Sequence, residues 1–456
     1  MTISSEFQAT GHSGLARIIV SSSLGTMLEY YDFFVYVALT GTFGTLFFPA
    51  QDPAVTGLLT AATFGIAYLA RPIGTCIFGP MADRIGRKRT FVVTLLLMGA
   101  ATVAMGCLPT YAAIGVAAPA MLLALRIIQG IGLGGEYGSA VVYVMEHVPQ
   151  RQRATYTSLL QSTATIGLLV ALAIVSALRM GLDAEVFNNW GWRVPFLLSA
   201  PIVAVATSVR LHMTETPTFL RMAKAGELLS SPLMDTLRSR EAWKSILLGV
   251  FGAQGATSVS LYTSIIYMLY FLQNVLHVPP MVTNACVAVA VLVAAPCYPL
   301  FGALADWVGR AMVMLGGIVL WMVAAYPVFS GIQAGAATAS WATVTTLITV
   351  LAVLTAMIMA PLPAFIAERF VGQNRTTGFG LAQQLGNILF GGFLPLISLA
   401  LVNWTGNPLA GVGYSIVSLV PCLVVTLVWG LRRDRTSAAV PDRTGCGTGL
   451  TRSQLS

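Results

Sequence analysis

Residues 79–89 read GPMADRIGRKR, and residues 302–310 read GALADWVGR. Both stretches contain the pattern Gly-x-x-Ala-Asp-x-x-Gly-Arg, 223 positions apart, and each follows a long apolar run. A charged turn that occurs twice between apolar segments is typical of a membrane protein built from two copies of one unit. The pattern therefore predicts a duplicated fold that spans the membrane.

The composition supports a membrane location for the whole chain. Of the 456 residues, 56% are hydrophobic and only 9% are charged, against about 25% charged residues in soluble domains. With a mean hydropathy of +0.79, too few polar residues remain to cover the surface of a soluble protein. No cleavable signal pattern follows the polar N-terminus, so the first apolar run is expected to be retained as a membrane span.

Twelve apolar runs are long enough to cross a bilayer, which takes about 20 residues in a helix. Charged residues, proline and glycine separate the runs, which cover residues 18–47, 57–81, 90–109, 116–144, 153–179, 194–211, 244–273, 281–304, 311–332, 339–366, 376–402 and 409–431. An even number of spans places both termini on the same side of the membrane. The sequence thus predicts an all-α membrane protein with twelve transmembrane helices in two pseudo-symmetric six-helix bundles.

The positions of the basic residues orient these spans. All but four of the 25 lysines and arginines lie in the tails, in loops that follow even-numbered spans, or at the ends of spans that border those loops. The exceptions are Arg179 and Arg193 near the opposite face, and Arg71 and Arg126 inside spans. Because basic loops stay in the cytoplasm, both termini are predicted to be cytoplasmic. This placement accounts for the net charge of +8 without a nucleic-acid partner.

The longest predicted loop divides the chain into two parts. Residues 212–243 form a cytoplasmic linker between an N-terminal bundle at 18–211 and a C-terminal bundle at 244–431. Residues 1–17 form a cytoplasmic tail, and residues 432–456 form a second tail that we expect to be disordered. Each bundle carries its Asp-x-x-Gly-Arg turn between its second and third helices, at equivalent positions of a 6+6 repeat.

The sequence offers little for catalysis, ATP hydrolysis or metal binding. The six cysteines form no C-x-x-C pair, and the four histidines are scattered at the ends of segments. Neither a P-loop, nor H-E-x-x-H, nor a nucleophile elbow occurs. We therefore expect no enzyme activity, no metal and no cofactor.

Longer motifs give a resemblance to a known family. GPMADRIGRKR resembles the signature loop between helices 2 and 3 of the major facilitator superfamily, and RIIQGIGLGGE at 126–136 resembles its fourth-helix pattern. Further motifs along nearly the whole chain are similar to those of the metabolite:proton symporter family: EYYDFFVY (29–36), RPIG (71–74), GGEYGSA (134–140), WRVPF (192–196), ETPTF (215–219) and FGG (390–392).

The resemblance implies a secondary active transporter of the bacterial inner (plasma) membrane that works by alternating access, as a monomer. Carriers of that family take citrate, 2-oxoglutarate, shikimate, aromatic acids, or the zwitterions proline and betaine. The resemblance also implies a central cavity lined by helices 1, 4, 7 and 10 and by parts of helices 2, 5, 8 and 11.

Five ionisable side chains lie inside the predicted spans: Glu29, Asp32, Arg71, Arg126 and Glu136. A charge at membrane depth is costly, so a functional role is the first expectation. Glu29 and Asp32 are three residues apart on one helix face, and two neighbouring carboxylates resist being ionised together. We predict proton coupling there, with Glu136 as a further candidate. The alternative is a structural web of ion pairs that holds helices 1, 2 and 4 together.

Other side chains inside the spans are candidates for binding substrate. An arginine can offer a two-pronged fork to a carboxylate, and an amide inside a membrane must find partners. The predicted substrate-binding residues are Arg71, Arg126, Tyr36, Gln161, Gln254, Tyr262, Gln383 and Gln384. The two arginines favour a small organic anion, a mono-, di- or tricarboxylate, carried with protons. A zwitterionic osmolyte such as proline or betaine is the alternative, and a non-transporting membrane sensor of the same fold is a weaker one.

The duplicated turn has a predicted gating role. Glycine permits close helix approach and tight turns, and an aspartate there can accept hydrogen bonds from a helix N-terminus or pair with an arginine. The predicted gating residues are Gly79, Asp83, Arg84, Gly86, Arg87, Asp306 and Arg310. In the second copy Trp307 replaces Arg84 and Ala311 replaces Lys88, so we expect a weaker lock there. The alternative is that these charges only orient the chain.

Two stretches are predicted sites of helix bending. APLP at 360–363 and FGGFLP at 390–395 combine proline with small or flexible residues inside apolar runs. Proline and glycine are common causes of kinks because they weaken the helical hydrogen-bond ladder. We expect the tenth and eleventh spans to bend at these points.

Overall fold

The computed structural model of the chain describes residues 12–49 and 53–430, and every regular element in these ranges is a helix. The predicted C-terminal tail, and most of the predicted N-terminal tail, lie outside them. The N-terminal half contains α2 (His12–Ala38), α3 (Thr40–Phe47), α4 (Pro53–Ile85), α5 (Arg87–Gly106), α6 (Tyr111–Ile114), α7 (Ala117–His147), η1 (Gln150–Gln152), α8 (Arg153–Gly181), α9 (Ala184–Asn189), η2 (Gly191–Arg193) and α10 (Val194–Leu211).

Two short helices in the linker, α11 (Pro217–Ala225) and α12 (Pro232–Arg238), precede the C-terminal half. That half contains α13 (Arg240–Leu248), η3 (Gly249–Gln254), α14 (Gly255–Leu261), η4 (Tyr262–Tyr267), α15 (Met268–Tyr270), η5 (Phe271–Val275), α16 (Pro280–Ala294), α17 (Cys297–Val308), α18 (Arg310–Ala337), α19 (Trp341–Met359), α20 (Leu362–Ala367), α21 (Arg375–Asn387), η6 (Ile388–Gly392), α22 (Leu394–Thr405), α23 (Ala410–Val425) and η7 (Thr426–Gly430).

The twelve-span prediction is confirmed. Ten helical segments in the described residues are long and apolar enough to cross a membrane, and they coincide with the third to twelfth predicted spans. The remaining two long helices are α2, with 27 residues, and α4, with 33. At about 1.5 Å per residue each exceeds the roughly 30 Å thickness of a hydrocarbon core.

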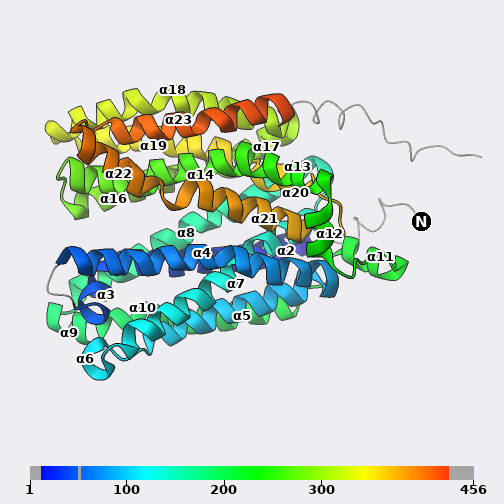
Figure 1. Ribbon diagram of the computed structural model, residues 1–456, viewed down its shortest axis with the longest axis horizontal. Helices are drawn as coiled ribbons and strands as arrows, with labels where there is room; N and C mark the ends of the chain where they lie inside the picture. The colour runs from blue at the N-terminus through cyan, green and yellow to red at the C-terminus, as the bar shows by residue number, and fades with distance from the viewer. Residues whose placement is uncertain (1–11, 50–52, 431–456) are drawn as a thin grey trace, which may run out of the picture.

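The long helices run roughly parallel and separate into two bundles (Figure 1). Within the N-terminal half α2 packs on α8, and α7 packs between α4 and α5; within the C-terminal half α19 packs on α16 and α18. The two halves meet where α4 lies along α21 and where α8 lies along α17. In Figure 1, α4 and α21 run side by side through the middle of the molecule.

The ends of the molecule differ in what they carry. The linker helices α11 and α12 lie at one end, and the short helices α3, α6 and α9 lie at the other (Figure 1). The basic turn at 84–89 and the linker share the first end. Following the positive-inside rule, we name it the cytoplasmic end and its opposite the outer end.

The regular α-helix is interrupted at or beside both stretches that were predicted to bend. Helix α19 ends at Met359 and α20 begins at Leu362, while α21 passes through the π-helical turn η6 before α22. The sequence did not predict that the seventh span would contain three π-helical segments, η3, η4 and η5. Such segments are rare in proteins and are frequently found at functional sites.

Candidate functional site

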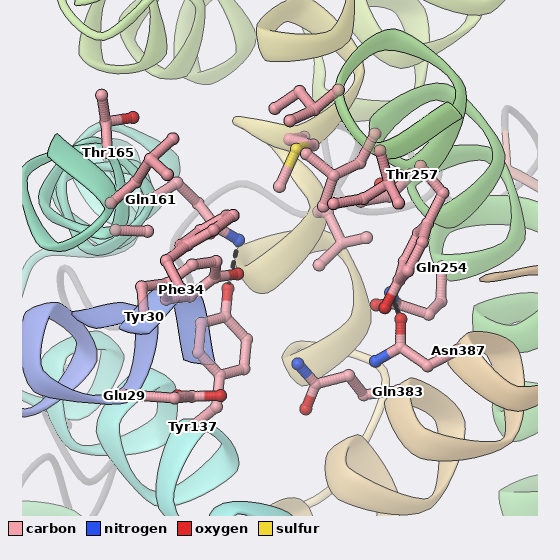
Figure 2. A pocket seen from close by; sticks show the side chains of 18 of the residues that line it. Glu29, Tyr30, Phe34, Tyr137, Gln161, Thr165, Gln254, Thr257, Gln383 and Asn387 are labelled. Atoms are coloured by element: carbon pink, nitrogen blue, oxygen red, sulfur yellow. Dashed lines mark hydrogen bonds between the residues drawn. The ribbon is translucent and has the colours of Figure 1, made fainter. Parts of the chain in front are cut away.

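A cavity lies between the two halves, and each half supplies one wall. Figure 2 shows Glu29 and Gln161 from the N-terminal half on one side, facing Gln254 and Asn387 from the C-terminal half on the other. The polar and aromatic lining residues are Glu29, Tyr30, Phe34, Tyr68, Arg71, Tyr137, Gln161, Thr165, Gln254, Thr257, Tyr262, Tyr298, Gln383, Gln384 and Asn387. Seven of the residues predicted to bind substrate or protons are among them.

Two charged side chains, Arg71 on α4 and Glu29 on α2, line this cavity among the described residues. Each is 8% exposed, and neither makes an ion pair within 4.0 Å in the described part of the chain. The Nε of Arg71 and the Oε2 of Glu29 are buried without a hydrogen-bond partner among the residues that the structure describes, and the guanidinium lies 4.0 Å from the ring centroid of Tyr68. A buried charge that lacks a partner is costly, so both groups are suited to a ligand.

Amide groups complete the polar lining. The Nε2 of Gln161 donates to the Tyr137 hydroxyl at 2.5 Å, and the Nε2 of Gln254 donates to Oδ1 of Asn387 at 2.9 Å. Within residues 12–49 and 53–430, the Oε1 atoms of both glutamines are buried without a hydrogen-bond partner. Because buried polar atoms normally have hydrogen-bond partners, these two oxygens are ready to accept hydrogen bonds from a bound molecule.

Asp32 lies in the N-terminal half and does not line the cavity. Its carboxylate accepts hydrogen bonds from the hydroxyls of Thr102 on α5, at 2.7 Å, and Ser199 on α10, at 2.8 Å. The Nε2 of Gln129 on α7 donates to Thr102 Oγ1 at 2.8 Å and extends the network. The three-residue spacing places Glu29 and Asp32 near each other on α2. Glu29 lines the cavity, whereas Asp32 belongs to a separate hydrogen-bond network.

Arg126 and Tyr36, both predicted to bind substrate, also do not line the cavity. Arg126 donates to Oε1 of Gln129 at 2.6 Å, and its guanidinium lies 3.2 Å from the ring centroid of Tyr36. The Tyr36 hydroxyl shares a hydrogen bond with Thr63. Arg126 thus joins Asp32 through Gln129 and Thr102, in one buried network of the N-terminal half.

Glu136 forms a buried ion pair with Arg210 on α10, at 2.8 Å, and neither side chain is exposed. Arg210 also donates to the backbone oxygen of Phe91 at 2.8 Å. On α2, Gly25 sits against the pair: a Cβ there would lie 1.5 Å from Arg210 Nη2. The described ion pair of Glu136 therefore joins the fourth and sixth spans, whereas the alternative considered from the sequence was a web between helices 1, 2 and 4.

The first copy of the duplicated turn binds the opposite half of the protein. Oδ1 of Asp83 accepts from the backbone N–H of Thr376 at 3.2 Å, and Oδ2 accepts from the N–H and hydroxyl of Thr377 at 2.9 and 2.8 Å. These amides belong to the first turn of α21, whose positive end favours an anion. Arg87 lies 3.4 Å from Asp83 and 3.5 Å from Glu146 at the end of α7.

The second copy makes the equivalent contacts, but from the C-terminal half to the N-terminal half. Oδ1 of Asp306 accepts from the backbone N–H of Ala154 at 3.0 Å, and Oδ2 accepts from the N–H and hydroxyl of Thr155, both at 2.8 Å. These amides lie in the first turn of α8, in the N-terminal half. Arg310 pairs with Asp306 at 3.1 Å and with Glu368.

We call the contacts of Asp83 and Arg87 the first lock and those of Asp306 and Arg310 the second lock. Each lock also contains a glutamate that was not predicted from the sequence. Glu146 pairs with Arg375 at 3.0 Å, and Glu368 pairs with Arg153 at 3.0 Å. The two glutamates, like the two arginines, are 222 positions apart, almost the 223 of the Asp-x-x-Gly-Arg turns. A search of the sequence for glutamates and arginines that recur 222 positions apart would have found them.

The two locks differ in burial. The side chains of Asp83, Arg87 and Glu146 are 0% exposed, whereas those of Asp306, Arg310 and Glu368 are 6%, 13% and 23% exposed. Charged contacts weaken as water reaches them.

The first lock is also joined to the linker. Glu215 accepts from the backbone N–H groups of Arg87 and Lys88, at 3.1 Å in each case. Gly86 has a φ of 121°, which favours glycine, and a Cβ there would also meet Glu215 at 2.3 Å. Arg84 and its counterpart Trp307 are exposed, so the substitution between them changes no lock contact.

Comparison with known proteins identifies the chain at the level of family. A model of the "Sugar (and other) transporter" family matches residues 18–429. The chain belongs to this family. As a member of it, and with the major facilitator fold, the chain is a multi-pass membrane transporter.

The transporter is similar to several proteins of known name. It is 33% identical to the inner membrane metabolite transport protein YhjE of Escherichia coli (strain K12), with 94% of this chain and 96% of the relative covered. It is 31% identical to the shikimate transporter of the same strain (92% and 95% covered) and 30% identical to the citrate-proton symporter of Salmonella typhi (88% and 90% covered). A putative proline/betaine transporter of Staphylococcus aureus (strain MSSA476) is 29% identical.

Solved structures share the fold of this transporter. The major facilitator superfamily proton:xylose symporter XylE, bound to 6-bromo-6-deoxy-D-glucose, superposes with a TM-score of 0.70 at 16% identity, covering 91% of this chain and 95% of that one. XylE from E. coli in an inward open conformation gives a TM-score of 0.56 at 20% identity.

In this transporter the cytoplasmic end is closed and the cavity continues toward the outer end. Both locks join the two halves at the cytoplasmic end. A vestibule of about 530 Å³, against about 110 Å³ for the inner cavity, reaches outward to Arg179, Gln273 and Asn284. The two spaces share Phe34 and Ile265 in their linings. The larger space therefore lies on the side of the cavity that is opposite to the two locks.

Proposed function

We propose that the protein is a proton-coupled symporter of a small organic acid in the inner membrane of a bacterium, working by alternating access. One observation carries the proposal: the cavity between the halves holds one arginine and one glutamate, neither in an ion pair with a described residue, among amides and aromatic rings. The names of similar proteins, which include a shikimate transporter and a citrate-proton symporter, support the same substrate class.

Arg71 is the proposed anchor for the substrate. Its guanidinium can donate two parallel hydrogen bonds to one carboxylate, which a point charge cannot do. The remaining oxygens of an organic acid would meet the amides of the opposite wall, among them Gln254, Gln383 and Gln384. A substrate held this way touches both halves, so its binding energy acts on their relative position.

Glu29 is the proposed proton carrier. Without substrate, the positive Arg71 and an ionised Glu29 balance each other across the cavity, although they are too far apart for an ion pair. An arriving carboxylate neutralises Arg71 and leaves Glu29 as an excess buried negative charge. Such a charge is costly, and taking up a proton removes it. Substrate and proton therefore bind together, which is what symport requires.

The locks are proposed to hold the outward-facing state. Opening toward the cytoplasm separates Asp83 from α21 and Asp306 from α8, so both sets of contacts are lost together. The more exposed second lock contributes less to this state than the first.

A zwitterion is the second candidate substrate class. Its two opposite charges would pair directly with Arg71 and Glu29. The similarity to a putative proline/betaine transporter supports this alternative. In that case Glu29 would have to remain ionised while substrate is bound.

Uptake by proteoliposomes tests the proposal. Purified protein would be offered labelled shikimate, 2-oxoglutarate, citrate and betaine, with the outside either acidified or at the same pH as the lumen. We expect one of the acids to accumulate only when the outside is acidic. Accumulation of betaine alone, abolished by Glu29→Gln, would support the zwitterion, and no uptake of any compound would favour a sensor.

A further inference from the structure

Tyr68 and Tyr262 connect the two halves inside the cavity. Tyr68 lies on α4 of the N-terminal half, and Tyr262 begins the π-helical segment η4 of the C-terminal half. The Tyr262 hydroxyl donates to the Tyr68 hydroxyl, and the rings meet edge to face with their centroids 6.3 Å apart. This bond crosses from one wall of the cavity to the other, whereas the locks join the halves at the cytoplasmic end.

Each tyrosine is held by its own half. The Tyr262 ring rests on Gly391 of η6, where a Cβ would lie 2.8 Å from the ring. The Tyr68 ring lies under the Arg71 guanidinium, 4.0 Å from it. Arg71, Tyr68, Tyr262 and Gly391 thus form a continuous chain of contacts from the substrate anchor to the opposite half.

The chain of contacts bears on the orientation of Arg71. Its Nε has no hydrogen-bond partner among the described residues, and the stacking on Tyr68 is a described contact that orients the plane of the guanidinium. A fork binds a carboxylate well only when its plane is correctly placed, because both hydrogen bonds depend on direction. Anything that moves the Tyr68 ring therefore moves the anchor.

We propose that the Tyr262–Tyr68 hydrogen bond is an affinity switch: it orients Arg71 for tight binding only while the halves stand as they do in this structure. Rocking of the halves by a few ångströms breaks this hydrogen bond, which removes one restraint on the Tyr68 ring and on the guanidinium stacked against it. The site then holds a carboxylate weakly when it faces the cytoplasm, which favours release. The inference rests on the proposed function and names two positioning residues within that site.

Single hydroxyl deletions test the switch from both sides of the membrane. Transport by Tyr262→Phe and by Tyr68→Phe would be measured in right-side-out and inside-out vesicles. The probe is whichever labelled acid, shikimate, 2-oxoglutarate or citrate, the wild-type protein accumulates best. We expect KM at the outer face to rise about three- to tenfold in each variant, the effect of one lost hydrogen bond, and KM at the cytoplasmic face to stay unchanged. The double variant should be no worse than either single one, because both remove the same bond.

Tyr267→Phe is the matched control. Tyr267 lies in the same π-helical segment, its buried hydroxyl has no hydrogen-bond partner in the described part of the chain, and it does not line the cavity. Its KM should be unchanged at both faces. Because the two test variants remove one bond from opposite halves, either can stand alone if the other fails to fold.

Equal rises in KM at both faces would show that the bond persists through the cycle and would overturn the switch. Unchanged KM at both faces would show that the bond does not orient Arg71. Neither result would touch the proposed symport, which fails only if the wild-type protein shows no acid-driven uptake.

Discussion

Buried charges occur in two kinds of surroundings in this protein. At the cytoplasmic end, Asp83 accepts three hydrogen bonds and pairs with Arg87, and both side chains are fully buried. In the cavity, Arg71 and Glu29 are almost as deeply buried but have no ion-pair partner in the described residues. The same residue types thus serve opposite purposes. Charges whose partners are built in hold helices together, whereas charges without partners are available to a ligand and a proton.

The largest effect is expected where a built-in partner is removed. Glu136→Gln leaves Arg210 buried without a counter-charge, and breaking such a pair costs about 3–5 kcal/mol. We expect a marked fall in the temperature of unfolding in detergent, with proton dependence retained by the protein that remains folded. Lys244→Gln, which breaks an exposed ion pair with Glu241, is the control and should change neither property. Normal stability with lost acid-driven accumulation would instead make Glu136 a proton site.

The next effect concerns the cavity. Arg71→Lys keeps the charge but loses the fork, and the charge-assisted hydrogen bonds at stake are worth about 1.5–3 kcal/mol. We therefore expect roughly ten- to hundredfold weaker binding of the transported acid, measured by equilibrium binding, with little change in thermal stability. Arg126→Lys should leave that affinity nearly unchanged, because Arg126 lies outside the cavity. Equal losses of affinity in the two variants would contradict the view that Arg71 binds the substrate in the cavity while Arg126 belongs to a separate buried network.

The smallest effect separates the two locks. Asp83→Asn should slow turnover about tenfold and Asp306→Asn about threefold, since charged hydrogen bonds matter less where water reaches them. Substrate affinity should change little in either variant, because neither residue lines the cavity. Uptake and exchange rates in proteoliposomes would measure both effects. Identical slowing by the two substitutions would mean that the burial of Asp83 and Asp306 does not determine how much each lock contributes to turnover.

The fold could be predicted from the sequence because its signals are local. Apolar length defines a span, basic residues orient it, and a repeated Asp-x-x-Gly-Arg turn reveals the duplication. The interruptions of the α-helix at or beside 360–363 and 390–395 follow from proline and glycine in the same way. The π-helical segments of the seventh span could not be predicted, since they depend on packing between helices.

The candidate site could be predicted only in part. The lining by Arg71, Gln161 and Gln254 follows from the rule that polar groups inside a membrane face other polar groups. That rule cannot separate a cavity from a sealed network, so it selected Arg126 on the same grounds. Arg210 was missed because an arginine at the end of a span resembles one that only orients the chain.

Glu29→Gln tests most directly the claim that the unpaired cavity charges couple substrate to protons. Counterflow, which needs binding and exchange but no gradient, and acid-driven uptake would be measured in the same vesicles, with Asp32→Asn in parallel. The account predicts that Glu29→Gln retains counterflow of the transported acid and loses its acid-driven accumulation, because the side chain can no longer take up the proton. Full acid-driven accumulation by Glu29→Gln, together with its loss in Asp32→Asn, would contradict the account and place the proton on the buried network that leads to Arg126.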